Sequence, residues 1–126
     1  KNGLVPRAAG KKYNREHLAY LTAICVLKHV MSTRDMDLLI REELQGRRSV
    51  EAGYAAFCAS LDKALTLTAQ EMEERGEQED LADAAIHFAL ISYAAGAASS
   101  RYVSLLRAQQ EAEASSKKTK KEKERD

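Results

Sequence analysis

Apolar residues along this chain recur mostly at intervals of three and four, which is the spacing of one face of an α-helix. Residues that favour helices, such as Ala, Glu, Leu and Lys, are abundant, and only one Pro occurs. Asn14 and Ser49 are typical N-cap residues, while Gly46 and Gly76 stand where helices commonly end. The pattern predicts four helices, over residues 15–30, 33–45, 49–75 and 78–113.

The first residues of the chain break this helical spacing. Leu4 and Val5 form a short apolar pair before Pro6, and the chain returns to an aromatic residue at Tyr13 after a turn that contains Gly10. Gly suits the turn because it tolerates positive φ, and Pro suits an edge where no ladder N–H is needed. We therefore expect an all-α fold with one small β-hairpin at its beginning.

The last predicted helix is apolar or small on nearly all sides between residues 84 and 100. Such a helix must be covered on more than one side. Small residues recur every three or four positions on it and would let another helix approach closely. We expect this small-residue stripe to form a homodimer interface; packing against the 49–75 helix of the same chain is the alternative. The stripe consists of Ala85, Ala89, Ser92, Gly96 and Ser100.

The order of features in residues 1–45 resembles the wing and following helices of MerR-type winged helix-turn-helix regulators. The chain has GLVP at residues 3–6 and KKYNREHLAYL at residues 11–21, which is similar to the pattern of an uncharacterised bacterial MerR-like family. The resemblance also includes Ile24, Ser32, Met36 and Leu39. It implies DNA binding and transcriptional regulation. In such proteins the recognition helix would precede Lys1.

Charge is segregated along the chain. Residues 1–15 carry five basic and no acidic side chains, residues 16–116 have a net charge of −7, and residues 117–126 have +3. A basic segment beside an acidic body suits an anionic partner such as DNA; the alternative is that these charges serve only solubility. The expected contacts to the DNA backbone, made by the wing, are Arg7, Lys11, Lys12 and Arg15.

No set of residues forms a recognisable catalytic or metal-binding motif. Asp80, Asp83 and His87 share one predicted helical face, but a single helix supplies too few ligands to hold a metal. Cys25 and Cys58 are expected to be reduced thiols of the core. We therefore expect no enzyme activity, no metal and no cofactor. The sequence identifies no effector, and a helical sensor that binds a small apolar effector among Tyr54, Phe57, Phe88 and Tyr93 is a further alternative.

These observations predict three regions: a partial winged-helix DNA-binding region over residues 1–45, a dimerising helical hairpin over residues 46–113, and a disordered basic tail over residues 114–126. The chain shows no signal-peptide pattern, and we expect a cytoplasmic protein without a membrane segment. The predicted function is DNA-binding transcriptional regulation of the MerR-like type. The alternative is a helical protein-interaction or oligomerisation module that does not bind DNA.

Overall fold

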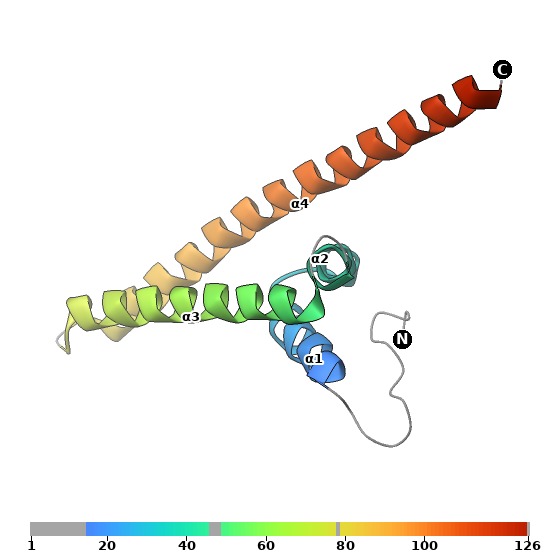
Figure 1. Cartoon of the computed structure of the whole chain (residues 1–126). Coiled ribbons are helices and arrows are strands. Elements are labelled where there is room, and N and C mark those ends of the chain that lie inside the picture. Colours follow the sequence, from blue (N-terminus) through green and yellow to red (C-terminus); the bar gives the residue numbers. More distant parts are fainter. Residues whose placement is uncertain (1–14, 46–48, 78, 126) are drawn as a thin grey trace. The chain divides into compact units, whose positions relative to one another are not determined.

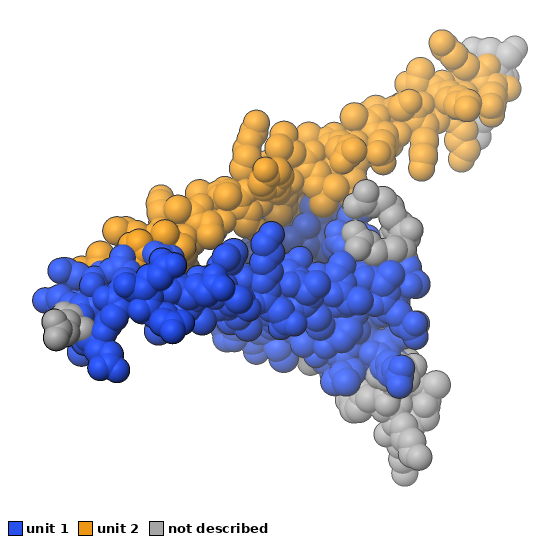
Figure 2. All heavy atoms as spheres, turned by 60° about the vertical axis from the view of Figure 1, so that its left-hand side comes forward, with its two compact units in different colours: residues 1–84 blue, residues 85–126 orange. Residues whose placement is uncertain are grey.

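The computed structural model describes residues 15–45, 49–77 and 79–125. Within these residues the chain forms four α-helices, which Figure 1 shows in chain order. Two compact units divide the chain, one ending at Ala84 and the other beginning at Ala85 (Figure 2). The helices are α1 (Arg15–Leu27), α2 (Thr33–Gln45), α3 (Val50–Arg75) and α4 (Leu81–Arg125).

We expected an all-α fold with one β-hairpin wing, and the wing is the part of this expectation that is wrong. The described part of the chain contains helices and turns but no strand, so its class is all-helical. The hairpin was expected within residues 2–13, which lie outside the described residues. An isolated two-stranded hairpin is at best marginally stable in water, so local turn signals alone are weak evidence for one.

Two predicted helix boundaries also differ from the structure. Helix α1 ends at Leu27 rather than near residue 30, because residues 28–30 form a turn in which the Val30 N–H donates to the Leu27 carbonyl at 3.0 Å. Helix α4 begins at Leu81 and continues to Arg125 instead of ending near residue 113. The Lys and Glu residues that suggested a disordered tail are good helix formers, and residues 114–125 are helical.

The first unit has a small apolar core between α1, α2 and the beginning of α3. The apolar spacing of α2 predicts an inward stripe of Met36, Leu39, Ile40 and Leu44. Three of these residues are buried, as predicted, and Leu39 is half-buried. The predicted inner face of α1 is only partly correct, because Leu18 is 60% exposed while Tyr20 is 2% exposed. The core cluster consists of Tyr20, Ala23, Met36, Ile40 and Leu44, with Ile24, Leu27, Met31, Val50, Tyr54 and Phe57 packed against it.

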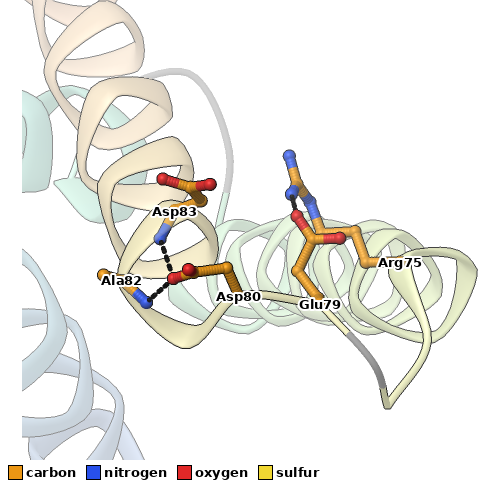
Figure 3. Close-up of polar contacts among 5 residues, drawn as sticks. All are labelled: Arg75, Glu79, Asp80, Ala82 and Asp83. Atoms are coloured by element: carbon orange, nitrogen blue, oxygen red, sulfur yellow. Dashed lines mark hydrogen bonds and ion pairs between the residues drawn. The ribbon is translucent and has the colours of Figure 1, made fainter.

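Side-chain oxygens cap the first turns of three helices, as the sequence suggested for two of them. The Ser32 hydroxyl accepts a hydrogen bond from the Asp35 N–H at 3.1 Å, and the Ser49 hydroxyl accepts one from the Ala52 N–H at 3.1 Å. At the start of α4 a carboxylate oxygen of Asp80 accepts from two backbone N–H groups (Figure 3). Each cap satisfies donors that have no partner inside the helix.

The connection between α3 and α4 begins with a glycine in a conformation that other residues rarely adopt. Gly76 has φ of +78°, and its N–H donates to the Glu73 carbonyl at 3.2 Å. Four residues apart, the Arg75 guanidinium and the Glu79 carboxylate form an ion pair across the same connection (Figure 3). The end of α3 and the cap of α4 are therefore fixed by local interactions.

A second glycine, Gly53, sets how closely α2 and α3 approach each other. It is buried, and a Cβ atom built on it would overlap the backbone carbonyl oxygen of Glu43. The same Cβ would also lie 3.1 Å from a methyl group of Leu44. Backbone atoms cannot move aside as a flexible side chain can, so only glycine permits this contact.

The Gly53→Ala variant should therefore unfold more easily than the wild type. We expect its free energy of unfolding to fall by about 2 kcal/mol, since α2 and α3 must move apart to admit the methyl group. Urea denaturation followed by circular dichroism measures this change. Gly96→Ala is the matched control, because a Cβ at Gly96 meets no atom within 4 Å and alanine favours the helix. Equal stability of the two variants would refute the close approach.

Candidate interaction surface

The residues with metal-binding or catalytic chemistry do not assemble into a site within the described part of the chain. No group of three His, Cys, Asp or Glu residues there could hold a metal ion. Asp80 instead caps α4, accepting from the Ala82 N–H at 2.8 Å and from the Asp83 N–H at 3.2 Å. The His87 ring packs edge-to-face against Phe88, with ring centroids 5.1 Å apart. The Asp80 carboxylate and the His87 ring therefore make local contacts with residues of α4.

The predicted DNA-contacting residues are largely outside the region that the structure describes. Arg7, Lys11 and Lys12 fall in residues 1–14, and only Arg15 can be placed. Arg15 is exposed and is the first residue of α1. It is thus available to an anion in solution, while the contribution of the other three basic residues stays a prediction.

The two cysteines do not both behave as core thiols. Cys25 is exposed on α1, and Cys58 is half-buried on α3; both are free. The expectation that they are reduced agrees with this state, but burial does not apply to Cys25. Exposure arises because α1 turns Tyr20 and Ala23 toward the core.

Helix α4 carries the most conspicuous surface of the described chain, a set of large apolar side chains exposed to solvent. Single exposed apolar residues are common on proteins, but a contiguous set marks an interaction site. Tyr93 is 81% exposed and Leu90 is 62% exposed. The exposed large apolar residues of α4 are Leu81, Ile86, Leu90, Ile91, Tyr93, Tyr102 and Leu105.

Part of this set follows the spacing of a coiled-coil seam. Ile86, Leu90, Tyr93 and Ala97 are separated by four, three and four residues, so they form one row along the helix. Ser100 and Ser104 continue the row with the same spacing. We call this row the α4 seam. Its side chains are large from Ile86 to Tyr93 and small from Ala97 to Ser104.

The small-residue stripe predicted from the sequence runs beside this seam. Ala85, Ala89, Ser92 and Ser100 are exposed, and Gly96 is half-buried. Ser100 belongs to both rows, so the seam and the stripe form one continuous surface. Sequence reasoning missed the seam because nearly every position between residues 84 and 100 is apolar or small, which hides the stronger spacing of the large residues.

Helix α3 adds a second exposed apolar region beyond the core. Its first half packs against α1 and α2 through Val50, Tyr54 and Phe57. Its second half exposes Leu67 and Met72, and Leu65 is 60% exposed. Apolar residues of α3 therefore continue beyond the part of the helix that packs against α1 and α2.

The apolar character of α4 also bears on membranes. Among the described residues, α4 is one helix that is long and apolar enough to cross a bilayer, judged by length and composition alone. The helix includes Asp83 at its start and Arg101 after its apolar middle. These charged residues lie on either side of the uncharged stretch over residues 84–100, which is near the lower limit of length for a membrane span. Length and composition alone are weak evidence for a span.

Comparison with models of protein families, with curated proteins and with solved structures finds no match to this chain. The resemblance of residues 1–45 to MerR-like regulators therefore stays a prediction from the sequence.

Proposed function

We propose that this chain is the self-associating helical part of a DNA-binding regulator, in which α4 joins two copies. The observation that carries the proposal is the α4 seam, whose large side chains Ile86, Leu90 and Tyr93 are 58%, 62% and 81% exposed. Burying one such side chain contributes about 1.5–3 kcal/mol. Because both copies would bury the same residues, a symmetric pair doubles this gain.

The distribution of side-chain size along the seam favours an antiparallel pair. If Tyr93 of one copy lies opposite Ala97 of the other, Leu90 lies opposite Ser100 and Ile86 opposite Ser104. Each large side chain then meets a small one, as close packing requires. A parallel pair would place large against large at one end and leave gaps between serines at the other.

Charge supports the same orientation. The beginning of α4 and the residues before it are acidic, with Glu77, Glu79, Asp80 and Asp83. Basic residues follow the apolar middle at positions 101 and 107. In the antiparallel register Asp83 lies near Arg107 of the second copy, whereas a parallel pair would bring the acidic ends together. Like charges in such contacts oppose association, so charge selects between the two orientations.

The regulator part of the proposal is supported by the sequence. Five basic and no acidic side chains occur in residues 1–15, and residues 1–45 resemble a MerR-like DNA-binding region. A two-fold dimer suits a DNA site with two half-sites. Contacts from Arg7, Lys11, Lys12 and Arg15 to phosphates would add affinity and fix position, without reading sequence themselves.

The alternative function is a helical interaction module without DNA binding. The exposed residues of α3, Leu65, Leu67 and Met72, favour it because they offer apolar surface to a partner helix. The two functions share the self-association of α4 and differ in whether the basic segment binds DNA. Two experiments therefore test the two halves of the proposal separately.

Self-association is tested by a charge placed on the seam. Leu90→Glu should raise the dimer dissociation constant at least tenfold, because it buries two carboxylates in the pair. Sedimentation equilibrium measures the constant. Ile91→Glu is the matched control, since Ile91 is an exposed neighbour that lies off the seam. The proposal is refuted if the wild type stays monomeric at a chain concentration of about 100 μM, at which even a weak dimer would form.

Gly96→Leu tests whether the small-residue stripe also faces the second copy. A Cβ atom at this position meets no other atom within 4 Å, so we expect the variant to leave the folding of the single chain intact. We expect the variant to weaken the dimer while its thermal midpoint at low concentration does not fall. An unchanged dimer would remove the stripe, but not the seam, from the interface.

DNA binding is tested by fluorescence anisotropy of a labelled duplex at two salt concentrations. The double variant Lys11→Ala, Lys12→Ala should bind more weakly and show a shallower salt dependence, since two fewer counterions are released. Lys28→Ala, Lys63→Ala removes the same charge from exposed positions of the acidic body and should leave the slope unchanged. Identical slopes for the two double variants would favour the module without DNA binding.

A further inference from the structure

Residues of α1, α2 and α3 line a hollow in the first unit that is partly open to solvent. Its volume is about 360 Å³, and three of its lining residues, Ala23, Ile40 and Leu44, belong to the buried core. Ligand pockets commonly have volumes of about 300–1,000 Å³, so this hollow is large enough for a small molecule. A hollow of this size beside a small core is a candidate ligand site.

The walls of the hollow select an apolar and flat molecule. Apart from Glu43 and Ser60, its lining consists of aliphatic, aromatic and glycine residues. Tyr54 and Phe57 form part of the wall, and their rings are nearly parallel, with centroids 6.5 Å apart and an interplanar angle of 11°. Stacked or edge contacts with such rings favour an aromatic ligand.

The two polar residues indicate what hydrogen bond the molecule should make. Glu43 and Ser60 both present oxygen atoms that accept hydrogen bonds, and Ser60 is exposed, so the hollow reaches the surface there. A ligand N–H or O–H group could donate to an oxygen of Glu43 or Ser60 while its ring contacts the apolar wall. Ligand sites commonly combine an apolar cavity of this volume with a few such polar groups.

We propose that the hollow between α1, α2 and α3 binds a small aromatic molecule of one or two rings that carries a single hydrogen-bond donor. The site lies within one unit and does not depend on the pairing of α4 or on DNA. Occupancy would stabilise the contacts among these three helices, because a ligand that binds only the folded state raises its stability.

Indole is a suitable probe, since it has two fused rings and one N–H group. The chain contains no Trp, so indole emission can be excited without a protein background from that chromophore. Added to the full-length chain, indole should show a saturable shift of its emission to shorter wavelength. We expect a dissociation constant on the order of 0.1–1 mM, which is typical of so few atoms. At ten times that concentration the thermal midpoint should rise by about 5 °C.

Two variants locate the binding. Ala56→Leu places a larger side chain in the lining and should weaken indole binding at least tenfold, while Ser60→Leu covers the exposed rim and keeps the test valid if the first variant fails to fold. Ala59→Leu, on the same helix but outside the lining, should bind as the wild type does. Leu90→Glu should also bind normally, because the hollow is separate from the seam.

The proposal is overturned if indole shows no saturable shift. It is equally overturned if Ala56→Leu and Ser60→Leu bind indole as well as Ala59→Leu does, since binding would then lie elsewhere. Loss of indole binding in Leu90→Glu would also contradict it, because the hollow would then need the second copy.

Discussion

The middle of α4 is apolar on nearly all sides, and this is the constraint on which the rest of the account depends. A surface helix normally places polar residues on the side that faces water. Between residues 84 and 100 this helix has no charged residue, and Leu90, Ile86 and Tyr93 are more than half exposed. Water disfavours such a surface. In the proposed pair, another α4 lying antiparallel covers it, so that large side chains meet small ones and Asp83 lies near Arg107.

The first unit is held by a different kind of contact. Its core is small, and α2 and α3 approach so closely at Gly53 that no side chain fits there. The same arrangement leaves a hollow beside Tyr54 and Phe57. Gly53, Glu43 and Leu44 make the close approach and also line the hollow. The tight contact between α2 and α3 therefore forms part of the wall of the proposed ligand site.

Much of the helical structure was predictable from local chemistry. Ser49 and Gly76 mark the ends of α3 because the cap hydrogen bond and the positive φ are decided by neighbouring residues. The inward face of α2 was predictable from its spacing as well. The β-hairpin wing has no support from the described residues, which contain no strand, and turn signals alone do not ensure a stable strand pair. The extent of α4 was missed because its charged end was taken for disorder, although Lys and Glu favour helices.

The interaction surface was only partly predictable. The composition of residues 84–100 indicated that other parts of the protein must cover this part of the helix. Composition could not show which row of residues faces the partner. The regular spacing of the small residues Ala85, Ala89 and Gly96 favoured the small-residue stripe as the interface and concealed the similar spacing of the larger residues beside it. Exposure of Ile86, Leu90 and Tyr93 in the folded chain was needed to find the seam. Tyr54 and Phe57 could be named from the sequence as part of an apolar ligand site, but the hollow itself could not be predicted, since residues of three helices line it.

Disulfide trapping tests the antiparallel pair most directly. With Cys25 and Cys58 replaced by serine, one chain carries Ile86→Cys and another carries Ser104→Cys, and the two are mixed under mild oxidation. Disulfides form only when the Cα atoms are about 4.4–6.8 Å apart, so the account predicts a cross-linked pair in the mixture and little in either chain alone. Cross-linking of Ile86→Cys chains with each other, or no cross-linked pair in the mixture, would contradict it.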